Sequence, residues 1–268
     1  MALEPVTVMV RGRAQVVSVA ELRAELDSDG PPRNLATLEA IVRCGDRAAA
    51  IARLRRIVRR GDPGVGTLQA IFGLVRLQAA DAAGELDALA ARLGGSPGAI
   101  AQAAALLVAD RVEALAAAVA DDAVLAHASP QPYLHEPKVP AGAPALFAAW
   151  VATLRKEAPR LGVTALRAFV GDVAEAAFRS LQHGADAGAL FCESDRALVV
   201  NTLCAELPGT TDFIAARGMA WLLGALEPHD ETVRAAIERA RDRFRDPEFQ
   251  ADCEAMLTAG AWPPKLQD

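Results

Sequence analysis

Four side chains that can transfer protons lie close together in the sequence: His127, Tyr133, His135 and Glu136. An imidazole near a carboxylate or a phenol is a common arrangement for general acid–base catalysis. Their stretch, HASPQPYLHEPKVPAGAP at 127–144, also holds five of the sixteen prolines. Loops present such groups for recognition, so we predict that Tyr133, His135 and Glu136 bind a partner. The alternative is that they are ordinary loop and core residues, and no catalytic residue is assigned.

An arginine-rich helix is predicted at 46–60, with Leu54 and Val58 on its core side. Its arginines are Arg53, Arg55, Arg56, Arg59 and Arg60. We expect them to cover the outer face, where Arg53, Arg56, Arg59 and Arg60 would form a patch for a phosphate, a nucleic acid or an acidic partner. The alternative is a solvated face paired with local acids. The net charge of −6 and the lack of interleaved aromatic residues for base stacking favour that alternative.

Two polar residues interrupt helices that are predicted to be interior because they are apolar nearly all round. Arg217 lies in TDFIAARGMAWLLGAL, and Asn201 lies in DRALVVNTLCAEL. A buried arginine must be paired, because an isolated buried charge is costly. Arg217 and Asn201 therefore either line an internal pocket, or form a structural ion pair and a hydrogen bond between helices.

Standard metal and cofactor motifs are missing from the sequence. There is no CxxC, HExxH, GxGxxG or Walker A loop. The four cysteines lie in segments that read as helix, which favours buried free thiols. We therefore predict no metal and no cofactor.

A β-hairpin followed by a capping helix is predicted for the first 30 residues. Two Val-rich runs flank Arg11-Gly12-Arg13, as strands flank a turn. Ser18 and Glu21 have the spacing of a capping box, in which each side chain bonds the other residue's backbone amide. The helix is expected to end before Gly30-Pro31-Pro32.

One helical domain with short breaks between its helices is predicted for residues 31–260. Asp62-Pro63, Ser96-Pro97 and Ser129-Pro130 each place a capping side chain before a proline at a predicted helix start. These pairs lie 34 and 33 residues apart, a spacing typical of helical repeats.

The Pro-rich segment at 128–144 interrupts this domain, because its prolines disfavour a helix. We predict an ordered, extended segment that replaces a repeat helix and borders the main binding surface, with Tyr133 and Leu134 as anchors. A disordered connector is the alternative. A partly disordered tail is predicted at 261–268.

Composition fits a soluble chain of packed helices. The 268 residues are 52% hydrophobic but only 4% aromatic, so Ala, Leu and Val must build the core. Such a core suits helix-on-helix packing and fits a β-sandwich poorly. The start of the chain lacks a signal-peptide pattern, and no apolar run reaches 18 residues. We therefore predict a cytoplasmic protein with no membrane partner. Heavy Ala, Arg and Gly usage suggests a bacterial source.

The helical segments resemble HEAT-like repeats, the paired helices of α-solenoids. The second helix of such a repeat often starts with an Asp-Pro-like turn, then Val-Arg and an Ala/Leu-rich face. DPGVGTLQAIFGL, SPGAIAQAAALL and HDETVRAAIERA look like this, although only the third has the Val-Arg pair, at Val233-Arg234. The resemblance covers residues 34–260, with a gap at the Pro-rich segment. It implies stacked antiparallel helical hairpins with an extended binding surface.

From this resemblance we expect a non-catalytic scaffold or adaptor that binds a protein or peptide. One alternative is an enzyme or small-ligand binder with a pocket between the helical halves. Another is nucleic-acid binding through the arginine-rich helix at 46–60. The oligomeric state stays open.

Overall fold

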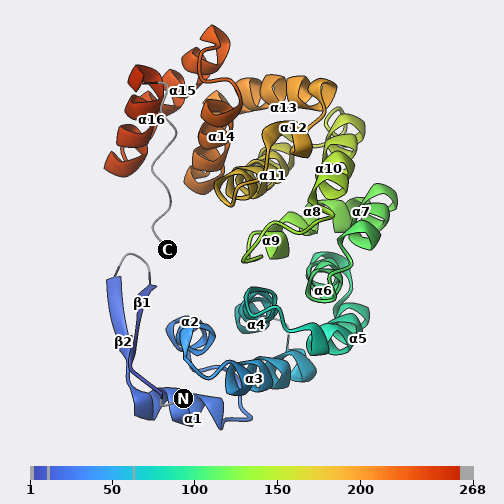
Figure 1. Cartoon of the computed structure of the whole chain (residues 1–268), viewed down its shortest axis with the longest axis vertical. Coiled ribbons are helices and arrows are strands. Elements are labelled where there is room, and N and C mark those ends of the chain that lie inside the picture. The colour runs from blue at the N-terminus through green and yellow to red at the C-terminus, as the bar shows by residue number, and fades with distance from the viewer. Residues whose placement is uncertain (1–2, 11–12, 63, 260–268) are drawn as a thin grey trace. The chain divides into compact units, whose positions relative to one another are not determined.

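The protein is a helical chain with a small N-terminal sheet (Figure 1). The computed structural model describes residues 3–10, 13–62 and 64–259. Helix makes up 74% of the structure, so the prediction of an all-α chain with an N-terminal β-hairpin is confirmed. The predicted tail at 261–268 and the turn residues Arg11 and Gly12 lie outside the described residues.

The chain divides into two compact units that do not follow a single cut in the sequence. Unit 1 comprises residues 1–115 and 131–137, and unit 2 comprises residues 116–130 and 138–268. The chain therefore leaves unit 1, returns to it for seven residues and leaves it again. This return falls inside the Pro-rich segment.

The N-terminal sheet packs on the helices through one face only. It consists of β1 (Val6–Val10) and β2 (Arg13–Val17), paired antiparallel. Val8 and Val17 are buried against Leu22 of α1 (Val19–Leu26) and Ala40 of α2 (Leu35–Arg43). Ser18 begins α1 with the predicted capping box, because its hydroxyl accepts from the Glu21 amide and the Glu21 carboxylate accepts from the Ser18 amide.

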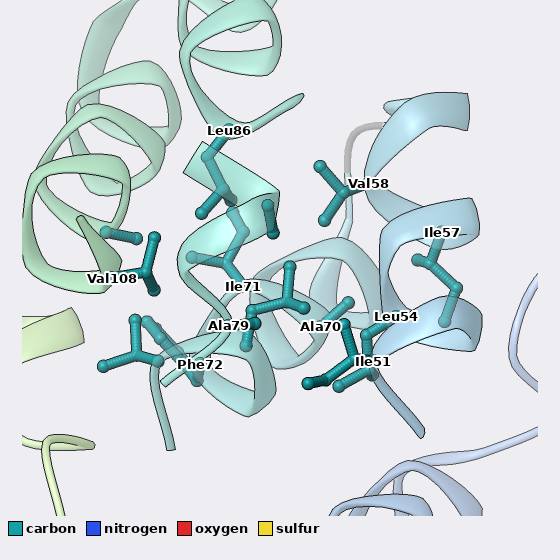
Figure 2. Packing of buried hydrophobic residues seen from close by; sticks show 14 of the residues in the cluster. Ile51, Leu54, Ile57, Val58, Ala70, Ile71, Phe72, Ala79, Leu86 and Val108 are labelled. Atoms are coloured by element: carbon teal, nitrogen blue, oxygen red, sulfur yellow. The ribbon is translucent and has the colours of Figure 1, made fainter. Parts of the chain in front are cut away.

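The other helices of unit 1 enclose a core of aliphatic side chains. They are α3 (Arg47–Arg60), α4 (Val65–Arg76), the 3₁₀ turn η1 (Ala80–Ala82), α5 (Ala83–Leu93) and α6 (Gly95–Val108). Figure 2 shows Leu54 and Val58 of α3, Ile71 of α4 and Leu86 of α5 in this core. All four are fully buried. Apolar burial of this kind holds α3 in place and so positions the arginines of its other face.

Unit 2 is built from helices of very different lengths, two of which approach each other closely. They are α8 (Ala123–Ala128), α10 (Ala143–Glu157), α11 (Val163–Gln182), α12 (Ala187–Leu190), α13 (Glu193–Glu206), η2 (Leu207–Gly209), α14 (Phe213–Leu226), α15 (Glu231–Arg243) and α16 (Pro247–Ala259). Two further helices cross a unit boundary: α7 (Val112–Asp121) and α9 (Pro130–Tyr133). Gly171 lets α11 touch α14, because a Cβ at this position would lie 2.6 Å from Ala215 Cβ.

The predicted Pro-linked caps are not the caps of these helices. Helix α4 begins at Val65 after Gly64, with no side-chain cap, and Pro63 lies outside the described residues. Ser96 lies inside α6. Ser129 follows α8 as its C-cap, although Pro130 does begin α9. The proline in α6 is tolerated because first-turn amides need no partner within the helix.

Candidate functional site

The arginine-rich helix α3 does not present all its arginines to solvent. Arg53 is fully buried, and its Nη2 atom donates to Glu25 Oε1 at 2.5 Å and to the Gly30 carbonyl at 3.1 Å. Glu25, near the end of α1, is fully buried as well. The prediction that Arg53 lies on an outer face was wrong, because α1 covers the side of α3 from which Arg53 projects.

Arg56 and Arg60 extend this contact along the loop after α1. Arg56 donates to the Leu26 carbonyl and pairs with Asp29 at 3.1 Å, and Arg60 donates to the Asp29 carbonyl at 2.9 Å. Carbonyls at a helix end carry partial negative charge and attract cations. We name Arg53, Arg56 and Arg60 the arginine clasp. It joins α3 to α1 and the loop that follows.

Arg59 faces α5 and is paired with an acid there. Its Nη2 atom lies 2.8 Å from Glu85 Oε1, and Arg55 pairs with the same carboxylate. Burial opposes ionisation of Glu85, but the hydrogen bonds from Arg59 and Arg55 prevail and hold its pKa below the ordinary value. The four arginines predicted as an anion patch are thus bonded to acids and carbonyls within unit 1.

The predicted binding residues of the Pro-rich segment lie in a short helix and the turns after it. Tyr133 ends α9 and is only 4% exposed, so its ring is not displayed on the surface. His135 stacks on Phe72 of α4, with ring centroids 4.4 Å apart. Leu134 and Glu136 are half-buried. The expected extended path was wrong, because prolines are tolerated in the first turn of a helix such as α9.

His127, the other histidine of this stretch, is held in unit 2. Its ring stacks on Phe169 of α11, with centroids 4.6 Å apart. Burial lowers the pKa of the imidazole from 6.5, while the nearby Glu157 carboxylate opposes this shift. His127 and His135 therefore belong to different units, each against a phenylalanine ring.

Unit 2 is expected to lose stability as the pH falls below 6.5, because the His127 imidazole resists protonation in the folded state. The unfolded chain binds that proton more readily, so the contribution of His127 is complete above pH 6.5 and lost as the pH falls through the folded-state pKa. His127→Phe should flatten the decline in melting temperature between pH 7 and 5. His183→Phe, at an exposed position, serves as the control. Equal slopes for all three proteins would contradict this assignment.

Arg217 and Asn201 differ in their surroundings. The Arg217 guanidinium lies 4.6 Å from the ring centroid of Trp221 and 5.6 Å from that of Phe213, a cation–π arrangement. Trp221 donates to Asp252 at 3.1 Å. Burial raises the pKa of Asp252 despite that hydrogen bond and the positive Arg217.

Asn201 is exposed on α13, which buries Val199 and Leu203. The prediction of an interior helix was therefore wrong for α13, although α14 does bury most of its residues. Arg217 is half-buried against aromatic rings, and Asn201 lines no interior space. The structure does not bring Arg217 and Asn201 into a shared binding role.

A groove that the sequence did not predict lies in unit 1, where the end of α3 meets the starts of α2 and α4. Its volume is about 260 Å³, and its lining is mainly apolar. The lining residues are Gly30, Pro31, Pro32, Asn34, Leu35, Leu38, Ile57, Arg60, Asp62, Gly64, Gly66 and Thr67. We name this space the α2–α4 groove. Its glycines and prolines read as helix breaks in the sequence, so they gave no signal of a shared surface.

The walls of the α2–α4 groove combine buried and exposed aliphatic groups. Leu38 and Ile57 are almost fully buried, whereas Leu35 is 44% exposed. Arg60 and Asp62 pair at 3.1 Å along the lining. A Cβ at Gly66 would lie 2.7 Å from Pro32 Cγ, whereas a Cβ at Gly64 would meet nothing within 4 Å. The groove therefore has room for an apolar group beside Gly64.

The described parts of the chain lack two other kinds of feature. No group of three or more His, Cys, Asp or Glu residues there could hold a metal ion. No described helix has the length and hydropathy needed to cross a bilayer. Comparisons with protein-family models, curated proteins and solved structures found no match.

Proposed function

We propose that the protein is a non-catalytic binding module for a protein or peptide, built from HEAT-like helical hairpins, and that the α2–α4 groove receives an apolar side chain of the partner. The groove carries this proposal, because an open apolar hollow with a few polar groups is the usual form of a ligand site. Leu35 on its wall is exposed and able to contact a partner.

Nucleic-acid binding through α3 has less support than the binding of an apolar group. Arg53 is buried, and Arg56, Arg59 and Arg60 are already bonded within unit 1. Binding phosphates through these residues would require the arginine clasp to exchange its carbonyl and carboxylate partners for phosphates. The α2–α4 groove needs no such exchange.

Selection from a random-peptide library against the wild-type protein tests this proposal. We expect enriched peptides to carry a shared aliphatic residue, and Gly64→Leu to weaken their binding by about tenfold or more, because burial of one aliphatic side chain contributes roughly 1.5–3 kcal/mol. The leucine would occupy the open space beside Gly64, whose extended backbone suits any residue.

The control is Arg59→Glu, at a half-exposed position outside the groove lining. This variant should keep its affinity for the selected peptides. If the selected peptides bound Gly64→Leu as tightly as the wild type, the proposal that they bind in the α2–α4 groove would be overturned. Stabilisation of the wild type by small apolar molecules, but by no peptide, would support the small-ligand alternative instead.

A further inference from the structure

Residues 131–137 return to unit 1 although both flanking segments belong to unit 2. On one side, Ser129 is fully buried and accepts a hydrogen bond from Trp150 Nε1 at 2.8 Å. On the other side, Ala143 begins α10 and is fully buried as well. The seven residues 131–137 lie in the sequence between these two buried positions and pack with unit 1, and we name them the strap.

The strap has a compact form of its own. The His135 amide donates to the Pro132 carbonyl at 3.0 Å, and the Glu136 amide donates to the Tyr133 carbonyl at 2.9 Å. These two bonds lie within the strap, so they need not break when it leaves unit 1. Prolines at 130, 132 and 137 also limit the conformational freedom that the strap gains when it is released.

Docking of the strap covers an aromatic ring of α4. Phe72 is only 8% exposed, and the His135 ring lies on it with an angle of 19° between the planes. Removal of the strap would expose this face of Phe72. The chain itself therefore shows what the α4 surface accepts, which is a proline-flanked peptide that places a flat ring on Phe72.

We propose that the strap is a displaceable intramolecular ligand, and that the α4 surface around Phe72 accepts a partner peptide of the same chemistry once the strap has left. The strap competes at high effective concentration, because it is tethered at both ends. It would therefore keep the site closed to weak peptides and open to those that bind more tightly. This site is separate from the α2–α4 groove and does not rest on the function proposed above.

A fluorescent peptide with the sequence of residues 129–138, added to the full-length protein, tests this inference. His135→Ala weakens the competing strap, so the peptide should bind this variant about threefold to tenfold more tightly than the wild type. Phe72→Leu keeps an apolar side chain in the core but removes the ring, and should lose peptide binding. His183→Ala, at an exposed position in unit 2, should behave as the wild type.

Amide hydrogen exchange measures strap docking directly in the same proteins. Exchange at residues 131–137 should be at least threefold faster in His135→Ala and Phe72→Leu than in the wild type, with α6 unchanged. Equal exchange rates at residues 131–137 in all three proteins would overturn the proposal that His135 and Phe72 hold the strap in place. The proposal that the peptide replaces the strap at Phe72 would be overturned by either of two results. The first is that the peptide binds Phe72→Leu as tightly as His135→Ala. The second is that its affinity for His135→Ala is no higher than for the wild type.

Discussion

Glu25→Leu is expected to lower the free energy of unfolding of unit 1 by about 3–5 kcal/mol, because it leaves the Arg53 guanidinium buried without a counter-ion. Arg53 and Glu25 are both fully buried, and they connect α3 to α1. Arg53→Met should also lower the free energy of unfolding, since it leaves the buried Glu25 carboxylate with only the exposed Arg33 guanidinium, 3.9 Å away. Urea unfolding followed by circular dichroism measures both effects.

The double variant Glu25→Leu/Arg53→Met distinguishes the net contribution of the ion pair from the cost of leaving one charge unpaired. It should recover most of the lost stability, because replacing a buried ion pair by apolar residues of similar volume is often neutral or stabilising. Arg53 Nε and Nη1 have no hydrogen-bond partner among the described residues, which weakens the native pair further. Arg59→Met, at a half-exposed ion pair, should change stability by less than about 1 kcal/mol. Strictly additive losses in the double variant would contradict this account.

Gly171→Leu is expected to destabilise unit 2 by at least about 3 kcal/mol, because α11 and α14 have no space for a side chain between them. A Cβ at Gly171 would lie 2.6 Å from Ala215 Cβ and 3.0 Å from Ala215 Cα. This clash can be relieved only if the α14 backbone moves, because rotation of a side chain cannot move Ala215 Cβ or Cα. Urea unfolding measures the loss.

Gly84→Leu is the matched control for this prediction. Gly84 lies in α5, and a Cβ there would meet nothing within 4 Å. Leucine has the higher helix propensity, so this variant should gain up to about 1 kcal/mol. If Gly171→Leu and Gly84→Leu had similar stability, the close contact of α11 with α14 would be refuted.

Local sequence patterns predicted the elements whose causes are local. The capping box at Ser18 and Glu21 depends on residues three positions apart, and the hairpin depends on two neighbouring Val-rich runs. Both were predictable for that reason. The start of α6 was misplaced at Ser96, because Gly94 in a left-handed conformation already ends α5 and allows the next helix to begin at once.

The candidate site was less predictable because its contacts join distant residues. Arg53 looks like its neighbouring arginines in the sequence, and only the packing of α1 on α3 decides that it is buried against Glu25. Similarly, the place of His135 depends on Phe72, 63 positions earlier in the sequence. The α2–α4 groove is formed by three helix ends that meet in space, so no short motif encodes it.

The interleaved course of the chain also sets an order for folding during synthesis. A ribosome releases residues 1–115 first, yet unit 1 is complete only after residue 137 has emerged. Residues 116–130 emerge before the strap, but the rest of the unit that buries Ser129 is synthesised later. At roughly 5–20 residues per second, the 131 residues from 138 to 268 take on the order of ten seconds to appear. Early in that interval, before α10 has emerged, α8 lacks the helix on which it packs, and Ser129 lacks Trp150 as its hydrogen-bond partner.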